Sequence, residues 1–529
     1  MATKPIDGQM PGTSGLRKKV KVWQEGFFLH NFVQSILDAW EGGTPKKLVL
    51  GGDGRYFSSE AIQEIIKICA ANGVEELYLG KGGLLSTPAA SGVIRRLEAD
   101  GGIVLTASHN PGGPDEDFGI KFNNKNGAPA PEAFTDNVYK ATTKITTVKT
   151  MENVPVPDLD TVGTTDIGAM KLHVIESVED YVTLLKEQFD FGKLKAFAES
   201  NPNFKLCFDA MHGAAGPYAK AIFEGELGLA NAELLRCDPL PDFGGSHPDP
   251  NLFYAADLVE KMGLTGDGTA KAGATGGPDL GAASDGDGDR NMILGKGCFV
   301  TPSDSLAVIA DWADAAIPGI AKRGGLKTVA RSMPSSGAVD AVAAKKGMKC
   351  FATPTGWKFF GNLMDADQMG YKEDLTPLLC GEESFGTGSD HVREKDGVWA
   401  VVAWLSILAE ANDPKTSPFK TELESGEFIG VKQVMERHWQ TYGRHLYSRW
   451  DFEGVGSDGA NAMVERLRGL NAESPELNPA EAEAETEADP MGSFDELLAL
   501  VFDSEAESEA EEEVAEPEVL KAVNIEDFR

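Results

Sequence analysis

The sequence predicts an α/β protein with more than one domain. Short apolar runs typical of buried strands alternate with longer segments that have the apolar spacing of helices, and this alternation builds parallel and mixed sheets. A strand followed by a polar loop recurs in three successive blocks of the chain. At 529 residues the chain is also too long for one hydrophobic core, so three or four domains are expected.

The first block begins with a basic segment at 13–19, which contains Arg17. It is interpreted either as a loop that meets an anion or as a solvated basic turn. Apolar runs that stop at glycine or polar residues predict strands at 47–50, 76–79 and 103–105. Helical spacing predicts helices at 28–40 and 59–71, and a helix at 176–189 is expected to close the domain. The stretch 141–170, rich in Thr, Val and Pro, receives no assignment.

The strand at 103–105 leads into Thr-Ala-Ser-His-Asn-Pro-Gly-Gly at 106–113. Ser108 and His109 would then lie at the carboxyl end of a strand, where open α/β sheets carry their chemistry. The alternative at this stage is an ordinary turn that happens to hold these residues. Lys121 follows in an apolar context, either extending its ammonium to solvent or serving as a pocket lysine that handles protons or phosphate charge.

The second block begins with a strand at 205–209 and contains Ser-Asp-Gly-Asp-Gly-Asp-Arg at 284–290. Asp285, Asp287 and Asp289 alternate with glycine, so a short loop can aim three carboxylates at one hard cation. A calcium-binding EF-hand loop would need Gly at its sixth position and Glu at its twelfth, where this chain has Arg290 and Lys296. We therefore predict a metal site that favours Mg²⁺ over Ca²⁺, because three carboxylates leave room for water or a phosphate oxygen.

The third block has a helix at 305–316 and strands at 328–330, around 350–351 and at 378–380. Polar loops follow at 353–358 and 381–386. Glu382 and Ser384 alternate in the second of these loops, so both can face one pocket and bind sugar hydroxyls. A loop whose glutamate is merely exposed to solvent is the alternative.

The charge and cysteine content limit the function classes. The net charge of −34 argues against nucleic-acid binding. Residues 471–520 hold 18 of the 83 acidic residues and no Lys, Arg or His, and this segment is expected to be disordered. Six scattered cysteines indicate free thiols in a reducing compartment and no zinc site. Neither a signal peptide nor a membrane-spanning run is recognised, so a cytoplasmic protein is expected.

Four motifs together resemble the α-D-phosphohexomutases: 106–113, 285–290, 381–386 and Lys-Asp-Gly at 395–397. The longer strings at 101–127, 353–358 and 389–397 are similar to the eukaryotic-type phosphoglucomutase branch. The resemblance covers roughly residues 10–470. It implies three similar α/β domains with mixed sheets around a central cleft, plus a truncated fourth α+β domain and the acidic segment. The implied bounds are 1–190, 191–303, 304–424 and 425–529.

The resemblance also implies a reaction and a role for each candidate residue. Glucose 1-phosphate and glucose 6-phosphate would be interconverted through a phosphoserine at Ser108, with glucose 1,6-bisphosphate as intermediate and activator. The chain would act on hexose phosphates as a monomer. Ser108, Asp285, Asp287 and Asp289 would bind one Mg²⁺. Arg17, His109 and Arg290 would line the phosphoserine site, Lys121 and Lys395 would transfer protons and contact phosphate, and Thr355, Gly356, Glu382 and Ser384, with Arg290, would bind the substrate.

The sequence departs from the family pattern after Asn461-Ala462-Met463. The Arg-x-Ser-Gly-Thr loop that grips the non-transferred phosphate in family members is not found, so an incomplete fourth domain with high KM and low turnover is expected. Two alternatives stay open. One is a weak or inactive relative with a regulatory or interaction role, and the other is an enzyme for another hexose phosphate such as a mannose phosphate.

Overall fold

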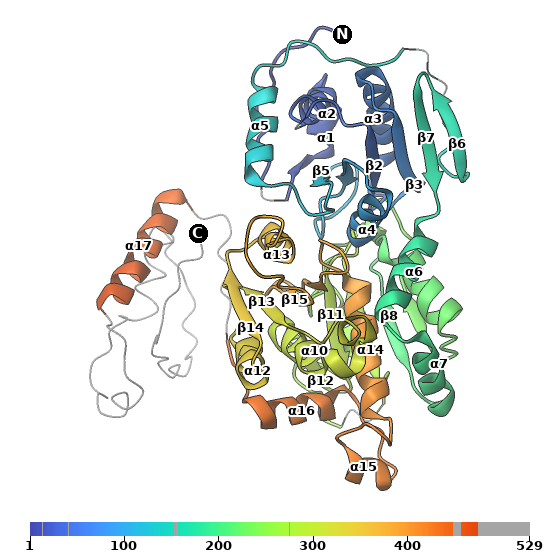
Figure 1. Ribbon diagram of the computed structural model, residues 1–529, viewed down its shortest axis with the longest axis vertical. Coiled ribbons are helices and arrows are strands. Elements are labelled where there is room, and N and C mark those ends of the chain that lie inside the picture. The colour runs from blue at the N-terminus through green and yellow to red at the C-terminus, as the bar shows by residue number, and fades with distance from the viewer. Residues whose placement is uncertain are drawn as a thin grey trace, which may run out of the picture. The chain divides into compact units, whose positions relative to one another are not determined.

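A computed structural model of the chain describes residues 1–12, 14–40, 42–152, 154, 157–273, 276–447 and 456–473. The chain divides into two compact units, Met1–His445 and Leu446–Arg529. Within the described residues, the second unit contributes one helix, α17 (Ser457–Glu473). The acidic segment predicted at 471–520 lies outside the described residues from residue 474 onward. The described part of the first unit is built on three mixed sheets (Figure 1).

The first sheet has the strand order β1-β5-β4-β2-β3-β7-β6. Strands β4, β2, β3 and β7 are parallel, while β1–β5, β5–β4 and β7–β6 are antiparallel pairs. The bounds are β1 Leu16–Lys19, β2 Lys47–Gly52, β3 Glu76–Leu84, β4 Gly101–Leu105, β5 Asp117–Asn124, β6 Gly163–Ile167 and β7 Met170–Ile175. The strands predicted at 47–50, 76–79 and 103–105 are therefore present.

The basic segment was wrongly predicted to be only a loop or turn. Its second half is strand β1, in which Leu16 pairs with Ile120 of β5 and is buried. A partner about 100 residues away stabilises this strand, so its own charged sequence does not reveal it. The unassigned stretch 141–170 contains β6, an edge strand that is mostly exposed and therefore has no apolar pattern.

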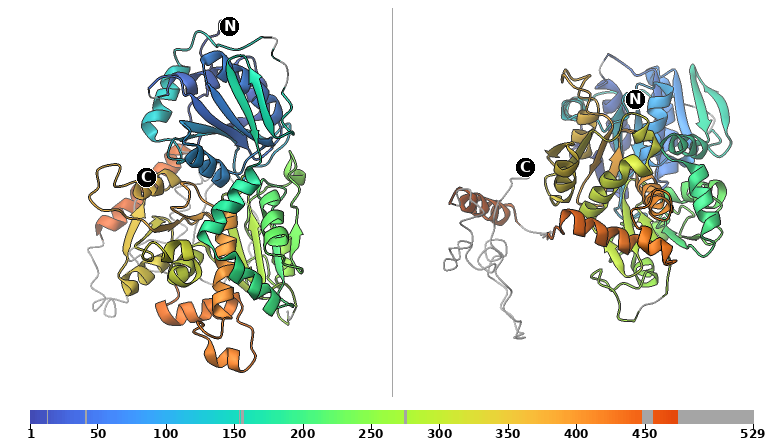
Figure 2. Two further views of the ribbon diagram at one scale, coloured as in Figure 1. Left: turned by 45° about the vertical axis from the view of Figure 1, so that its right-hand side comes forward. Right: turned by 60° about the horizontal axis from the view of Figure 1, so that its bottom comes forward.

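Alternating side chains of the first sheet enter two different hydrophobic cores. Leu48 and Leu50 of β2 pack in one core, and Val49 between them packs in the other, as the two-residue period of a strand requires. Four helices share the first core: α1 (Val20–Gln24), α2 (Phe28–Asp38), α3 (Ser58–Asn72) and α5 (Glu132–Thr142). Helix α4 (Thr87–Leu97) packs in the second core, on the side of the sheet that faces the rest of the unit (Figure 2).

The second sheet has the order β12-β11-β10-β8-β9. Strands β10, β8 and β9 are parallel, and β11 and β12 add antiparallel. The bounds are β8 Leu206–Asp209, β9 Glu233–Leu235, β10 Leu280–Ser284, β11 Asn291–Gly295 and β12 Cys298–Val300. The accompanying helices are α6 Ser177–Gln188, α7 Phe191–Ser200, α8 Ala215–Ala219 with the π-helical turn η1 Lys220–Glu226, the 3₁₀ turn η2 Phe243–Gly245 and α9 Ala256–Lys261.

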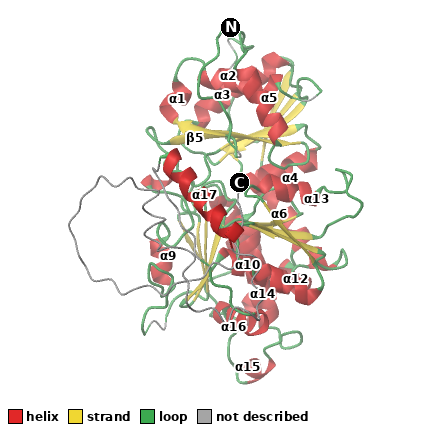
Figure 3. Cartoon of the chain, turned by 90° about the vertical axis from the view of Figure 1, so that its left-hand side faces the viewer, coloured by secondary structure: helices red, strands yellow, loops and turns green. Residues whose placement is uncertain are grey.

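The third sheet has the order β14-β13-β15-β16, with β16 antiparallel to β15. Its strands are β13 Thr328–Ser332, β14 Lys349–Thr353, β15 Leu378–Gly381 and β16 Thr387–Ser389. The helices of this region are α10 Pro302–Ala316, α11 Pro318–Ala321, α12 Ala338–Lys346, α13 Trp357–Met364, α14 Gly397–Ala411, α15 Lys420–Glu424 and α16 Val431–Tyr442. Helix α14, whose position in the fold is labelled in Figure 3, is buried along its whole length, as its apolar residues on every side predict.

Helix α14 joins the second and third sheets into one hydrophobic core. It contacts β10 and β11 of the second sheet, β16 of the third sheet, and helix α10. None of the helices in the described part of the chain has the length and apolar character needed to cross a bilayer. The six cysteines are free, five of them buried and Cys350 exposed, which confirms the expectation of free thiols.

Candidate active site

The loop after β4 holds Ser108 in a constrained conformation. Ser108 is 4% exposed and has a φ of 54°, in the left-handed region that few non-glycine residues adopt. Its backbone N–H donates to the Thr106 hydroxyl at 2.7 Å. Its own hydroxyl lies 3.2 Å from Oδ2 of Asp285 and 3.4 Å from Nδ1 of His109. The loop therefore presents the Ser108 hydroxyl to the acidic loop of the second sheet.

A buried ion pair holds this loop in place through hydrogen bonds. Arg55 and Asp53 follow β2, lie 2.9 Å apart and are both inaccessible to solvent. The Asp53 carboxylate accepts from the Thr106 hydroxyl at 2.6 Å, and the Arg55 guanidinium donates to the Ser108 carbonyl at 2.7 Å. Arg55 also donates to the carbonyl of Asp117 at 2.9 Å. The pair thus ties the ends of β2, β4 and β5 together around Ser108.

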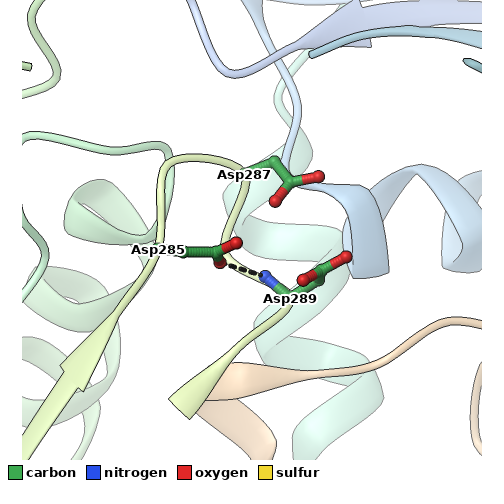
Figure 4. A group of neighbouring side chains, drawn as sticks. All are labelled: Asp285, Asp287 and Asp289. Carbon is green, nitrogen blue, oxygen red and sulfur yellow. Dashed lines mark hydrogen bonds between the residues drawn. The ribbon is translucent and has the colours of Figure 1, made fainter. Parts of the chain in front are cut away.

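Three buried carboxylates project from the turn between β10 and β11. Oxygen atoms of Asp285, Asp287 and Asp289 lie within 4.8 Å of one another, and Figure 4 shows the three side chains around one space. The Asp289 N–H donates to Oδ1 of Asp285 at 2.9 Å and closes the turn. Gly288 has a φ of 77°, and a side chain on Gly286 would contact the Ser108 carbonyl, so the glycines allow the loop its close approach.

The charges in this loop favour a bound cation. Burial, together with Asp287 and Asp289, raises the pKa of Asp285 well above its usual range, and burial and Asp287 also raise the pKa of Asp289. Burial opposes ionisation of Asp287 too, but Lys121 and the Thr87 hydroxyl lower its pKa. Oδ1 of Asp287 is buried and has no hydrogen-bond partner among the described residues. Such a cluster of hard oxygen donors could hold a metal ion.

Two lysines face the carboxylates. Nζ of Lys121 on β5 lies 3.3 Å from Asp287 and 3.8 Å from Asp289, and Nζ of Lys395 lies 3.2 Å from Asp289. Burial opposes the charged form of both lysines, but the neighbouring carboxylates outweigh it and raise both pKa values. Glu394 lies 3.9 Å from Lys121 and accepts from Asn123 at 2.8 Å; burial raises the pKa of Glu394 to about 7.

The basic residues around Ser108 include Arg17 and Arg290. Arg17 lies on β1, and burial lowers its pKa. Arg290 ends the acidic turn and is 3.4 Å from Asp249 and 3.9 Å from Asp285. Burial and the charges of Arg290 and Arg17 lower the pKa of His109 to about 2, so His109 is neutral. Two guanidinium groups therefore lie near Ser108, and that of Arg290 also lies close to the Asp285 carboxylate.

The third sheet contributes the remaining candidates. Glu382 follows β15, is buried, and accepts from Ser384 at 3.1 Å and from Lys395 at 3.0 Å. Despite burial, the charges of Lys395 and Arg290 lower the pKa of Glu382. Thr355 and Gly356 precede α13, and Thr355 is exposed. Asp396, next to Lys395, caps α14 by accepting from the Trp399 N–H at 2.9 Å.

One cleft brings residues of the three sheets together. The candidates from the sequence that line it are Arg17, Ser108, Lys121, Asp289, Arg290, Thr355, Gly356, Glu382, Ser384 and Lys395. The other three candidates adjoin this set, because His109 and Asp285 contact Ser108, and Asp287 contacts Lys121. The structure thus gathers every candidate residue into one region, where Lys and Arg side chains lie beside carboxylates.

Sequence reasoning missed several residues that contact the site, among them Asp53, Arg55, Glu394 and Thr87. Asp53 and Arg55 follow a predicted strand just as Ser108 does, so the same strand-end signal could have identified them. Glu394 lies within a family-like string but received no role. Thr87, which contacts Asp287, carries only the signal of a helix start, Ser-Thr-Pro. Nothing local links Thr87 to a carboxylate 200 positions away.

Three family models match the chain in order. The α/β/α domains I, II and III of phosphoglucomutase/phosphomannomutase match residues 8–149, 179–297 and 301–424. Among curated relatives, the cytoplasmic phosphoglucomutase of Mesembryanthemum crystallinum is 51% identical over 489 residues, which cover 90% of this chain and 80% of the relative. That of Solanum tuberosum is 50% identical over 491 residues, with the same coverage.

A solved structure gives the same result. The open form of the exocytosis-sensitive phosphoprotein pp63/parafusin, a phosphoglucomutase from Paramecium, has 48% sequence identity and a TM-score of 0.79. The match covers 90% of this chain and 82% of that chain. The ranges that the family models match include every candidate residue of the site. The chain therefore belongs to the phosphoglucomutase/phosphomannomutase family, in the eukaryotic-type branch of the α-D-phosphohexomutases.

Proposed function

We propose that this protein is a phosphoglucomutase that interconverts glucose 1-phosphate and glucose 6-phosphate through a phosphoserine at Ser108. The relatives that share half of its sequence carry this name. The observation that carries the site assignment is the Ser108 hydroxyl, which lies 3.2 Å from Asp285 at the edge of a buried carboxylate cluster. A seryl phosphate at this position would lie close to the acidic loop and to the guanidinium groups of Arg17 and Arg290.

Asp285, Asp287 and Asp289, together with the oxygen of Ser108, would hold one Mg²⁺. When bound, the ion supplies charge neutralisation and polarises the seryl phosphate. Two features support this donor set. Oδ1 of Asp287 is buried without a hydrogen-bond partner among the described residues, and burial beside one another disfavours the ionised forms of Asp285 and Asp289 unless a cation is bound. Oxygen donors with open positions for phosphate or water suit Mg²⁺.

Phosphoryl transfer depends on positioning and on offsetting negative charge. In the first step the bond between phosphorus and Oγ of Ser108 breaks, a bond to O6 of glucose 1-phosphate forms, and the hydroxyl proton of the sugar ends on Oγ. Glucose 1,6-bisphosphate then turns around in the cleft and returns its other phosphoryl group to Ser108. Arg17, Arg290 and Lys121 would offset phosphate charge near Ser108, and their position in the lining of the same cleft supports this role.

The sugar would bind on the opposite side of the cleft. Glu382 and Ser384 offer an acceptor and a hydroxyl, and the loop of Thr355 and Gly356 adjoins them. Lys395 contacts both Glu382 and Asp289, so it lies between the sugar side and the acidic loop. We propose that Lys395 contacts the phosphate or hydroxyl that approaches Ser108.

Further properties complete the proposal. Hexose phosphates are the proposed substrates, glucose 1,6-bisphosphate the activator, and a monomer the working form. The bounds 1–190, 191–303, 304–424 and 425–529 are kept as proposed domain limits. A cytoplasmic location, expected from the sequence, agrees with the names of the relatives.

The test is intact-protein mass before and after incubation with glucose 1,6-bisphosphate, followed by peptide mapping and a coupled assay of glucose 1-phosphate turnover. We expect one added phosphoryl group, located on Ser108, and formation of glucose 6-phosphate. Absence of the added mass, or a phosphoryl group on another residue, would refute the proposal. Comparable turnover of mannose 1-phosphate would show a broader hexose specificity instead.

A further inference from the structure

The two carboxylate oxygens of Asp287 have different surroundings. Oδ2 accepts a hydrogen bond from the Thr87 hydroxyl at 2.6 Å and lies 3.3 Å from the Lys121 ammonium. Oδ1 is buried without a hydrogen-bond partner among the described residues. One oxygen is therefore held by protein groups, and the other is left for a ligand. Because the last torsion of an aspartate is broad, something must fix which oxygen faces which way.

Thr87 is well placed to do this. It is the first residue of α4, has no solvent exposure, and also donates its backbone N–H to the Asp287 carbonyl at 2.9 Å. The preceding residue, Ser86, caps α4 by accepting from the Ala89 N–H at 3.3 Å, so the first turn of the helix is itself fixed. A side chain on Gly288 would lie only 3.3 Å from Ser86. The start of α4 thus lies directly against the acidic turn.

We infer that Thr87 is a positioning residue for the metal site: its hydroxyl fixes Oδ2 of Asp287 and thereby orients Oδ1 toward the cation. This inference rests on the proposed metal site. Outer partners of metal ligands orient the ligand, and their loss typically weakens metal binding about 10- to 100-fold. Among the described residues, the other group that contacts Oδ2 is the Lys121 ammonium, and its long flexible side chain fixes the carboxylate torsion less strictly than a hydroxyl at the start of a helix. Thr87 also links α4 of the first sheet to the turn of the second.

The chain offers a matched set of variants. Thr87→Val keeps the shape and the backbone N–H but removes the hydroxyl, whereas Thr87→Ser keeps the hydroxyl and removes the methyl group. Thr142→Val is the control, because Thr142 is also buried in the first domain and bonds through its hydroxyl, to the Tyr139 carbonyl at 2.7 Å, on helix α5. Asp287→Ala removes the proposed ligand itself.

The measurement is calorimetric titration of MgCl₂ into the metal-stripped, unphosphorylated full-length protein. We expect Thr87→Val to raise the Mg²⁺ dissociation constant about 10-fold or more. The Mg²⁺ dissociation constants of Thr87→Ser and Thr142→Val should stay within about twofold of the wild-type value. Thr87→Ser keeps the hydroxyl at residue 87, and Thr142→Val does not alter that residue. The rise in melting temperature on adding Mg²⁺ should shrink in Thr87→Val by mass action, which gives a second readout independent of turnover.

Each outcome decides between the two proposals. Wild-type affinity in Thr87→Val, or an equal loss in Thr87→Ser, would overturn the role of the hydroxyl while the metal site stands. If the wild-type protein bound no more Mg²⁺ than the Asp287→Ala variant does, the metal site would be refuted, and this inference with it. If Thr87→Val fails to fold, as its melting curve would show, Thr87→Ala takes its place with the same expected loss.

Discussion

The Arg55 guanidinium donates to the backbone carbonyl of Ser108 at 2.7 Å and is itself held by the buried carboxylate of Asp53. The residue that would carry the phosphoryl group is therefore supported by an ion pair that never reaches solvent. Removing one member of such a pair leaves an uncompensated buried charge, which is far more damaging than loss of an exposed pair.

Arg55→Met should destabilise the protein by about 3–5 kcal/mol, because Asp53 is left buried and unpaired. It should also slow phosphorylation of Ser108, since the loop loses its support. Urea denaturation and the rate of phosphorylation by glucose 1,6-bisphosphate measure the two effects. The double variant Asp53→Asn/Arg55→Met should recover part of the stability, because the unpaired charge is gone. A double variant no more stable than Arg55→Met would contradict this account.

Ser108→Ala should abolish mutase activity and leave the fold intact. Among the described residues, the Ser108 hydroxyl has two polar contacts, both long, at 3.2 and 3.4 Å, so we expect a change in the free energy of unfolding within about 1 kcal/mol. Circular dichroism, thermal melting and the coupled assay are the measurements. Substantial turnover by the alanine variant would show that another residue carries the phosphoryl group.

Asp287→Ala should lose Mg²⁺ binding and activity together. Two carboxylates leave the ion short of ligands, and we expect affinity to fall at least about 100-fold. Addition of EDTA should lower the melting temperature of the wild type and leave that of this variant unchanged, because only the wild type gains stability from the ion. Calorimetry that finds unchanged Mg²⁺ affinity in the variant would remove Asp287 from the site.

Glu382→Ala should impair sugar binding more than phosphorylation of Ser108. The carboxylate contacts Ser384 and Lys395, in the part of the cleft proposed to bind the sugar, and no contact with Ser108 is among those of the described residues. We expect KM for glucose 1-phosphate to rise about 10-fold or more, in line with the loss of hydrogen bonds to a charged group. The rate of Ser108 phosphorylation by a large excess of glucose 1,6-bisphosphate should change less. An equal loss of both would mean that Glu382 supports the loop and does not contact the sugar.

His438 predicts a pH dependence of stability. It is buried on α16, and burial lowers its pKa to about 4, below the ordinary value near 6.5 that it regains on unfolding. The unfolded chain therefore binds a proton that the folded chain does not, and stability falls as pH drops from about 6.5 toward 4. At pH 5 the loss is about 2 kcal/mol relative to pH 7.5.

His438→Gln removes the group that binds this proton. The difference between the free energies of unfolding measured with urea at pH 5 and at pH 7.5 should therefore shrink by about 2 kcal/mol. Because both pH values are measured on each variant, a general loss of packing at residue 438 cancels in the comparison. An unchanged pH difference in the glutamine variant would show that His438 does not titrate as its burial implies.

The sequence alone determined the α/β class, most strands of the parallel core, the acidic turn, and the strand-end loop of Ser108. Each of these is a local pattern: apolar runs define buried strands, and alternating Asp and Gly define a turn of carboxylates. The family-like motifs added the sugar loop and Lys395.

The tertiary structure alone decided what surrounds these groups. Strand β1, which carries Arg17, forms because it pairs with β5, and the polar edge strand β6 forms on β7, although neither has an apolar pattern. The hydrogen bond from Thr87 to Asp287 joins residues 200 positions apart. The charge balance of Lys121 depends on three carboxylates from loops that follow strands of the other two sheets. Such contacts depend on which loops the folded sheets bring together, and no short stretch of sequence encodes that.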